Sequence, residues 1–233
     1  MFANAQSAPG RKTVFATLAG VALITSFLLG GLPAARAQGG IAAPPAAVGT
    51  SFNSSFNGGH GGWSIVYGPW VQGTAEFTTV GTAGYFSSII HSDTYHNFVY
   101  TAKMRRTSSN DHAGSGLIIR GSSSSLTADK QWANAYYFNY TNASEVVITK
   151  IAGGVATGLD YTISPAVNAG GWNTLKVVAY DDVMLFYVNG TRIFTLDDPT
   201  WALGSVGISM YRSVGSTSNK LRVDWAKLQV INY

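Results

Sequence analysis

The chain has 233 residues, contains 27 glycines, and is 12% aromatic but only 11% charged. It has no cysteine, which excludes a disulfide framework and a thiolate metal site. Abundant glycine and aromatic residues with few charges are typical of short strands joined by tight turns, and they disfavour a helical protein.

The N-terminal segment predicts a signal peptide over residues 1–37. Arg11 and Lys12 precede an apolar stretch over residues 13–32, and Pro33 ends it. Residues 35–37, Ala-Arg-Ala, form a small-residue cleavage site. The alternative is an uncleaved anchor, because the apolar stretch approaches the ~20 residues that span a bilayer. We therefore expect a secreted protein, extracellular or periplasmic, with no membrane span after cleavage.

Removing that leader changes the charge balance. The formal net charge of +4 includes three basic residues of the leader, which has no acidic residue. Twelve basic residues then face eleven acidic ones in the rest of the chain. The mature sequence has no basic stripe typical of nucleic-acid binding, so we expect no nucleic-acid partner.

Residues 38–50 are rich in Gly, Ala and Pro and predict a linker. From residue 51 to residue 233 the sequence alternates short apolar runs with turns, which predicts one domain of about a dozen strands. Polar loops are expected over residues 108–116 and over the Ser-rich residues 121–130. No window in this region has helical periodicity. The pattern predicts an all-β fold, a two-sheet antiparallel β-sandwich or jelly roll.

The clearest elements lie between Gly170 and Phe194. Residues 174–180 alternate apolar and polar side chains, and residues 183–188 form a dense β-branched and aromatic run. Asn189-Gly190 is a strong signal for a two-residue hairpin turn of type I′, which needs positive φ at both positions. The segment predicts a three-stranded antiparallel meander.

Several segments together carry a family resemblance. In chain order they are GGW, FVYTAKMRR, GLIIR, GWNTLKVVAY, FYVNGTRIF, GSVGISMYR and VDWAKLQV. The chain from Ser51 to Tyr233 resembles the concanavalin A-like lectin/glucanase superfamily, and within it laminin-G-like modules and the 3-keto-disaccharide hydrolase domain. The resemblance implies two curved sheets with a concave face that commonly meets carbohydrate. It says little about activity, because this fold hosts lectins, glycanases and adhesion modules.

The sequence lacks the catalytic motif of the retaining glycanases in that superfamily. Those enzymes use an E-x-D-x-x-E strand, whose two Glu carboxyls must lie ~5–5.5 Å apart. This chain has only Glu76 and Glu145, and neither has an acidic neighbour at that spacing. The pair Asp197-Asp198 precedes Pro199 in a turn-like segment and is interpreted as turn residues.

A carbohydrate-binding face is easier to support. Aromatic rings stack on sugar C–H groups, and Arg or Asn side chains form paired hydrogen bonds. Along each expected strand, polar or aromatic side chains alternate with apolar ones and should point to the opposite side of the sheet. The candidate ligand-binding residues are Lys103, Arg105, Arg120, Trp132, Tyr137 and Asn139. If these strands are adjacent, the set lines one sheet face. The alternative is that the aromatic side chains are core and that the arginines are merely solvated.

The sequence also contains three possible metal sites. His91, Asp93 and His96 contain good metal ligands, as does the pair Asp111-His112, although loop polar residues explain both. In many members of the resembled superfamily, an Asp of the final strand holds a structural Ca²⁺ on the convex side. Asp224, in Val223-Asp224-Trp225, is the candidate here, and alternation with Leu221, Val223 and Trp225 points it away from the core. A carboxylate paired with Lys or Arg is the alternative.

Three functional hypotheses remain open on the sequence. The first is a secreted, non-catalytic carbohydrate-binding or surface-interaction module, with a glycan or other extracellular ligand as partner. The second is a hydrolase or lyase acting on modified disaccharides through His91, Asp93 or Arg120. The third is a structural or adhesive cell-surface protein. Clustering of His91, Asp93, Arg105 and Arg120 in one pocket would favour the enzyme.

Overall fold

A computed structural model describes residues 49–231, and these residues form fifteen strands and no helix. The predicted signal peptide and nearly all of the predicted linker lie outside the described residues. The first eight strands are β1 (Phe52–Ser54), β2 (Trp63–Tyr67), β3 (Trp70–Gln72), β4 (Phe77–Thr79), β5 (Phe86–Tyr95), β6 (Phe98–Ser108), β7 (Ser115–Leu126) and β8 (Trp132–Tyr140). The other seven are β9 (Glu145–Ala152), β10 (Val155–Ile163), β11 (Trp172–Tyr180), β12 (Val183–Val188), β13 (Thr191–Asp197), β14 (Gly204–Tyr211) and β15 (Asn219–Val230).

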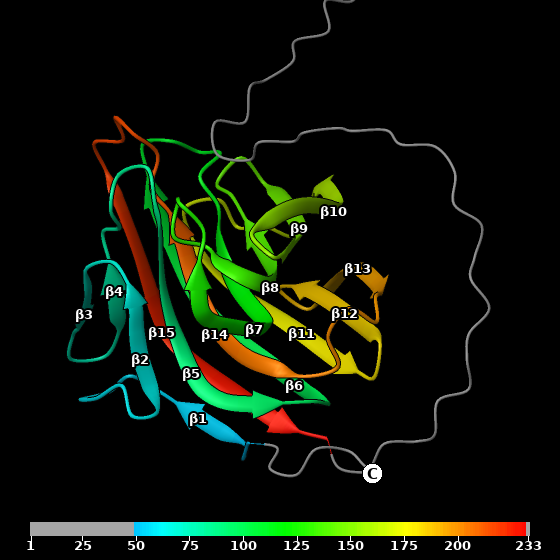
Figure 1. Cartoon of the computed structure of the whole chain (residues 1–233). Helices are drawn as coiled ribbons and strands as arrows, with labels where there is room; N and C mark the ends of the chain where they lie inside the picture. The colour runs from blue at the N-terminus through cyan, green and yellow to red at the C-terminus, as the bar shows by residue number, and fades with distance from the viewer. Residues whose placement is uncertain (1–48, 232–233) are drawn as a thin grey trace, which may run out of the picture.

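The strands form two antiparallel sheets, as the sequence predicted. The eight-stranded sheet has the order β13-β12-β11-β6-β15-β4-β3, and β1 also pairs with β15. The seven-stranded sheet has the order β10-β9-β8-β7-β14-β5-β2. The long strands of both layers are visibly curved (Figure 1). The expected jelly-roll sandwich is confirmed.

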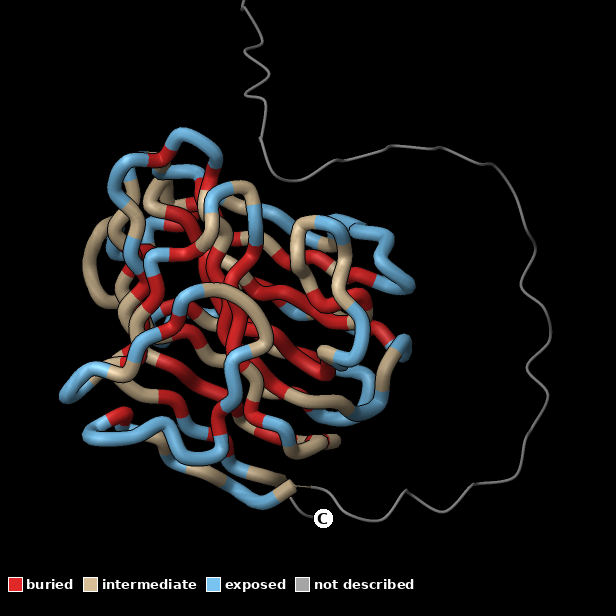
Figure 2. The backbone as a smooth tube through the Cα atoms, turned by 60° about the vertical axis from the view of Figure 1, so that its left-hand side comes forward, coloured by how far each residue is buried: buried red, intermediate tan, exposed pale blue. Residues whose placement is uncertain are grey.

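Alternating side chains from both sheets meet in one apolar core. From the eight-stranded sheet, β6 and β11 contribute fully buried side chains such as Tyr100 and Val177. From the seven-stranded sheet, the Phe138 ring packs on Phe186 of β12 with 5.1 Å between centroids. Buried residues accordingly run through the middle of both layers, and exposed residues lie in the connecting loops and in edge strands such as β10 (Figure 2). Each sheet is left with one outer face.

The predicted meander is confirmed as β11, β12 and β13. Asn189 and Gly190 connect the last two strands with φ values of 49° and 84°, as a type I′ turn requires. The Asn189 side chain supports the turn, because its oxygen accepts a hydrogen bond from the Thr174 amide at 2.8 Å. A short loop thereby fixes the register of all three strands.

Three features departed from the sequence-based expectations. The Ser-rich segment expected as a loop continues β7 as far as Leu126, because a bulge after Ile119 turns the strand and keeps it paired with β8. Residues 155–163, for which no strand was predicted, form β10 at the edge of the seven-stranded sheet. In β15 a bulge after Val223 breaks the simple alternation, so Ala226 is buried and Trp225 lies at the surface.

The structure also bears on the expected absence of a membrane span. Residues 49–231 contain no helix that is long and apolar enough to cross a membrane.

Candidate functional site: a hollow on the seven-stranded sheet

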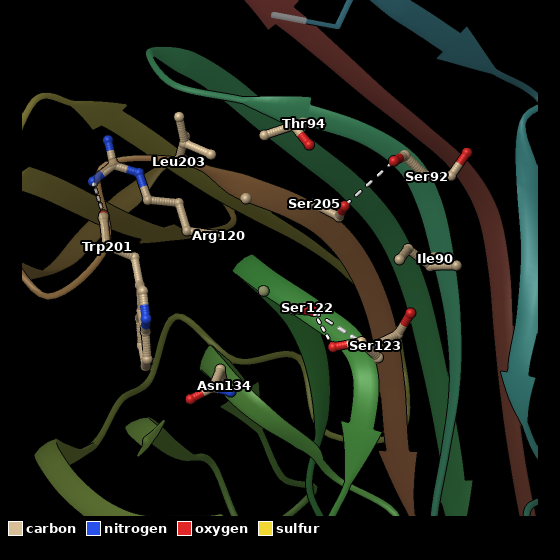
Figure 3. A pocket seen from close by; sticks show the side chains of 13 residues that line it. Ile90, Ser92, Thr94, Arg120, Ser122, Ser123, Asn134, Trp201, Leu203 and Ser205 are labelled. Carbon is tan, nitrogen blue, oxygen red and sulfur yellow. Dashed lines mark hydrogen bonds between the residues drawn. The ribbon is translucent and has the colours of Figure 1, made fainter. Parts of the chain in front are cut away.

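The outer face of the seven-stranded sheet contains a hollow of about 620 Å³ (Figure 3). Strands β5, β7, β8 and β14 and the loop between β13 and β14 surround it, and its lining residues are Ile90, Ser92, Thr94, Arg120, Gly121, Ser122, Ser123, Ser124, Asn134, Trp201, Leu203, Gly204 and Ser205. Hydroxyl groups dominate this lining, with one amide, one indole and two aliphatic side chains. None of the lining residues is Asp or Glu.

A bulge in β7 shapes the floor of the hollow. Arg120 has a φ of 48°, which is uncommon for a residue other than glycine, and the pairing with β8 is interrupted between Ile119 and Ser122. The backbone of β14 approaches closely at Gly204, where an added Cβ would lie 2.3 Å from the carbonyl carbon of Arg120. Only glycine fits there. The bulge turns the end of β7 out of the plane of the sheet and opens space beside it.

Arg120 was a candidate ligand-binding residue, and the structure places its side chain in the protein interior, with 2% of the residue exposed. Its guanidinium donates hydrogen bonds to the carbonyl oxygens of Trp201 at 3.1 Å and His96 at 3.0 Å. Burial lowers the pKa of this guanidinium, and nearby Tyr136, Asp182 and Asp181 oppose that effect. Arg120 thus ties the loop that carries Trp201 to the turn between β5 and β6. The expectation that Arg120 lies outside the core is wrong.

The loop that carries Trp201 is fastened from the other side by Asp198. The Asp198 carboxylate accepts hydrogen bonds from Tyr136 Oη and Lys150 Nζ, each at 2.8 Å, and also from the hydroxyl of Thr200. Burial would raise the pKa of Asp198, but hydrogen bonds from Lys150, Thr200 and Tyr136 lower it to about 2. The Trp201 ring meets Tyr136 edge-on at 5.0 Å. The interpretation as turn residues holds for Asp198, which also has a buried anchoring role that the sequence did not show. Asp197 is instead the exposed last residue of β13.

Trp132 lies behind Gly121, which is one of the lining residues. It is fully buried and lies against two glycines: a Cβ added to Gly207 or Gly121 would come within 3 Å of the indole. Its Nε1 donates to Ser88 Oγ at 3.1 Å, and its backbone amide donates to Tyr137 Oη at 2.6 Å. Both rings belong to a second apolar cluster, made of Ile118, Trp132, Ala135, Tyr137 and Ile151. Trp132 and Tyr137 therefore fill part of the outer face and do not lie open to solvent.

The six candidate ligand-binding residues would line one face only if their strands were adjacent, and the strands belong to two different sheets. Lys103 and Arg105 lie on β6, in the eight-stranded sheet, whereas the other four lie on β7 and β8 of the seven-stranded sheet. The alternation was correct, but β6 and β7 belong to different layers, and alternation carries no information about which strands pair. Asn139 is half-buried, with its side chain beside Gly114 and Gly116. Which of the six contact a ligand stays a prediction.

Sequence reasoning missed the residues that give the hollow its chemistry. Ser92, Asn134, Trp201 and Ser205 come from four separate segments, and no spacing in the sequence relates them. A weak signal existed for Trp201, because a tryptophan that directly follows a Pro-containing turn is placed on a loop and not in a strand core.

The first possible metal constellation is dispersed. His91 points inward, stacks on Phe52 at 4.0 Å and shares a 2.8 Å hydrogen bond with Tyr95 Oη. Burial lowers the pKa of His91, and the Asp93 carboxylate partly opposes this. His96 lies in the next turn, 4.0 Å from Asp181. Within residues 49–231 no group of three or more His, Asp or Glu side chains is placed to hold a metal ion.

The proposed calcium ligand has a protein partner. The Asp224 carboxylate points away from the core, as predicted, and forms an ion pair with Lys103 Nζ at 2.8 Å. Both side chains are about one-third exposed. A calcium ion bound at Asp224 would have to displace this ammonium group. Calcium binding at Asp224 remains a prediction.

A second polar constellation lies at one end of the sandwich. The buried Glu145 carboxylate bonds to His112 Nδ1 at 3.0 Å and accepts hydrogen bonds from Thr141 Oγ1 at 2.9 Å and Tyr161 Oη at 3.3 Å. His112 also lines a smaller hollow of about 390 Å³, together with Asp111 and neighbouring loop residues. A carboxylate that holds one imidazole nitrogen fixes the orientation of the ring and leaves the other nitrogen free to act.

Comparison with known proteins agrees with this architecture. The fold is similar to carbohydrate-binding module CBM66 from Bacillus subtilis, with a TM-score of 0.57 and 19% identity over 70% of this chain and 94% of that one. It is also similar to a β-glucanase from Bacillus licheniformis, with a TM-score of 0.62 and 14% identity over 78% of this chain and 99% of that one. At these identities the likeness concerns the fold alone.

Sequence comparison gives a family. A search of curated proteins found no match. Residues 51–215, more than half of the chain, match the family described as 3-keto-alpha-glucoside-1,2-lyase-like domain. The expected superfamily is thereby confirmed, and the chain belongs to the family of 3-keto-alpha-glucoside-1,2-lyase-like domains.

Proposed function

We propose that this protein binds a neutral carbohydrate, without catalysis, in the hollow of the seven-stranded sheet. The observation that carries the proposal is the lining itself, in which hydroxyl and amide groups surround an accessible indole and no carboxylate is present. Sugars offer many hydroxyl groups for hydrogen bonding and C–H faces for stacking on an aromatic ring. Trp201, half-buried on the loop, extends toward Asn134 and can supply that ring (Figure 3).

The hollow is also held in shape before any ligand arrives. Arg120 and Asp198 fasten the Trp201 loop from two sides, and β7, β8 and β14 are joined by backbone pairing. A site whose side chains are already fixed loses less conformational entropy on binding. The hydroxyl groups of the hollow each bind weakly, and holding them in fixed positions therefore favours recognition of a sugar.

The composition of the hollow argues against glycoside hydrolysis there. Glycoside hydrolysis by the usual route needs two carboxyl groups flanking the bond, and the lining has none. Arg120, the single charged residue in the lining, is already bonded to two carbonyl oxygens. The named relative CBM66, a carbohydrate-binding module, supports a binding role for the fold. The predicted signal peptide would place this binding outside the cytoplasm, and that location is part of the proposal.

A glycan array of the domain from residue 38 onward, followed by calorimetry on the best neutral oligosaccharide, tests this proposal. Trp201→Ala should weaken binding by about tenfold or more, because central aromatic contacts dominate binding energy. Ser92→Phe, which places a ring in the hollow from an exposed position of β5, should block it independently. Trp225→Ala, at a half-buried tryptophan on the opposite sheet, is the matched control and should bind normally. Unchanged affinity in both hollow variants would contradict the proposal.

A second candidate function, a lyase or hydrolase on modified disaccharides, is favoured by the pair of His112 and Glu145. A base held by a buried carboxylate could remove the acidic proton beside a sugar ketone, at C2 of a 3-keto-glucoside, and expel the substituent at C1. Incubating the protein with a 3-keto-α-glucoside and following release of the C1 substituent tests this activity. Activity lost in His112→Gln and kept in Trp201→Ala would favour it over the binding proposal, and no turnover by the unmodified protein would dismiss it.

A further inference from the structure

The outer face of the eight-stranded sheet gathers most of the positive charge of the domain. Of the twelve Lys and Arg residues between positions 49 and 231, seven lie on the outward side of β6, β11, β13 and β15. We call this surface the cationic face, and its members are Lys103, Arg105, Lys176, Arg192, Lys220, Arg222 and Lys227. Three carboxylates, those of Glu76, Asp197 and Asp224, reach the same face. This concentration of basic residues on one face cannot be seen in the sequence, because basic and acidic residues are nearly equal in number there.

Strand register aligns part of the cationic face into a row. Arg192 pairs with Tyr187, Tyr187 with Lys176, Lys176 with Thr101, and Thr101 with Lys227. The row thus crosses five strands, with a cation on every second one. Since neighbouring strands lie ~4.8 Å apart, the cations recur about every 10 Å.

Aromatic rings hold several of these cations against the sheet. Lys176 Nζ lies 3.9 Å from the centroid of the Tyr187 ring, and Lys227 Nζ lies 5.2 Å from that of Trp225. Such cation–π contacts orient the ammonium groups but leave part of each free for an anion. The cations are therefore positioned along the surface.

Most of these charges are not neutralised by the protein. Lys103 pairs with Asp224 at 2.8 Å, and Arg222 pairs with Glu76 at 2.6 Å. For the remaining five, no carboxylate of residues 49–231 lies within ion-pair distance; they are Arg105, Lys176, Arg192, Lys220 and Lys227. Uncompensated charge concentrated on one face attracts anions and raises their rate of association.

From this arrangement we infer that the cationic face binds an anionic polysaccharide, one that bears carboxylate or sulfate groups at intervals along an extended chain. The row of Arg192, Lys176 and Lys227 offers one cation about every 10 Å, which suits a sparsely charged polymer. Duplex DNA carries one charge per about 1.7 Å, and the acidic residues elsewhere on this nearly neutral domain would repel it.

An anionic membrane fits the cationic face less well. Peripheral membrane sites combine basic residues with apolar side chains that enter the lipid. The most exposed large apolar side chains of this face, Val71, Tyr180 and Val183, lie at its margins and not along the row. The cationic face therefore offers regularly spaced charges without the apolar side chains that a membrane site needs.

The test measures binding of the domain from residue 38 onward to polygalacturonate and to dextran sulfate by affinity electrophoresis and calorimetry. Neutral dextran, duplex DNA and vesicles with anionic lipid are run in parallel. We expect binding to at least one of the two acidic polysaccharides that weakens as salt is raised from low to physiological concentration, because exposed ionic contacts are screened. Binding to neither, or tighter binding to DNA or to vesicles, would overturn the inference.

Charge-matched variants locate the surface. The triple variant Lys176→Gln, Arg192→Gln, Lys227→Gln should lose about tenfold or more in affinity, since three ionic contacts are removed. The control Ser125→Asp, Ala156→Asp, Thr157→Asp lowers the net charge equally at exposed positions of the other sheet and should lose much less. Equal losses in the two variants would show an effect of net charge only and would contradict a defined surface. Ser92→Phe should leave this binding unchanged, so the result is independent of the carbohydrate site proposed in the hollow.

Discussion

The two outer faces of this sandwich differ although the sheets behind them share one core. On the seven-stranded sheet, a bulge at Arg120 lies beside a hollow whose single charged residue already has protein partners. On the eight-stranded sheet, the strands present rows of cations, two of which pair with carboxylates. A regular sheet surface displays its side chains, whereas an irregular one can enclose space. The two faces are therefore suited to different ligands.

Arg105 and Arg120 show the same contrast between a regular strand and a bulged one. In the sequence, Arg105 and Arg120 both alternate with apolar residues, which predicts an outward position for each. Arg105 is half-exposed, and its Nε donates to the Gly170 carbonyl at 2.7 Å. Arg120 sits at a bulge with positive φ and is enclosed. The same alternation of polar and apolar residues thus places Arg105 at the surface and Arg120 in the interior.

The largest expected effect comes from the fully buried Trp132. Trp132→Ala should destabilise the protein by ~3–5 kcal/mol, because it leaves a cavity over Gly207 and removes a buried hydrogen bond. Trp225→Ala, at a half-buried position of the opposite face, should cost about 1 kcal/mol or less. Chemical denaturation of both variants checks the difference, and similar losses would contradict a core-packing role for Trp132.

The arginine pair gives the next prediction. Arg120→Ala should lower the free energy of unfolding by ~2–4 kcal/mol, because two partly buried carbonyl oxygens lose charge-assisted hydrogen bonds. Arg105→Ala should lower it by about 1 kcal/mol or less, because solvent reaches the site. Urea denaturation measures both, and a neutral Arg120→Ala variant would refute the clamp between the Trp201 loop and the β5–β6 turn.

The hairpin of the eight-stranded sheet can be broken locally. Gly190→Val should destabilise by roughly 1–3 kcal/mol, because a β-branched residue resists the φ of 84° found there. No atom lies within 4 Å of an added Cβ, so the cost would come from the backbone and not from a clash. An unchanged melting temperature would contradict the type I′ turn.

Acid should loosen the loop beside the hollow through Asp198. Hydrogen bonds lower the pKa of this carboxyl from 3.8 to about 2 in the folded protein. Its stabilising contribution is therefore complete above about pH 4 and is lost as the pH falls toward 2. Asp198→Asn should be less stable at neutral pH and should show a flatter decline between pH 4 and 2. Parallel pH–stability curves for the two proteins would refute the anchoring role.

Calcium gives the smallest expected effect, because one carboxylate is a thin ligand set for an ion that takes 6–8 oxygens. If calcium binds at Asp224, EDTA should lower the melting temperature, added calcium should restore it, and Asp224→Asn should abolish the response. Differential scanning calorimetry measures this. A melting temperature indifferent to EDTA and to calcium would end the proposal and leave Asp224 as the ion-pair partner of Lys103.

The sequence predicted the fold well because strands and turns leave local signatures. Alternation over residues 174–180 and the pair Asn189-Gly190 each specify their structure within a few residues. The bulges at Arg120 and after Val223 carry no such signature, and each moves the following side chains to another face. The hollow depends on one of those bulges and on contacts between distant segments, such as Arg120 with Trp201, so its residues could not be predicted.

The most direct test of the proposed carbohydrate site is an NMR titration that follows the six tryptophan indole N–H signals. These side chains are spread over both sheets, and Trp201 is the one whose half-buried ring lines the hollow. A neutral oligosaccharide chosen from the array should shift the Trp201 signal most and leave those of Trp172 and Trp225, on the other outer face, unchanged. A titration in which Trp172 or Trp225 shifts while Trp201 stays fixed would contradict binding in the hollow.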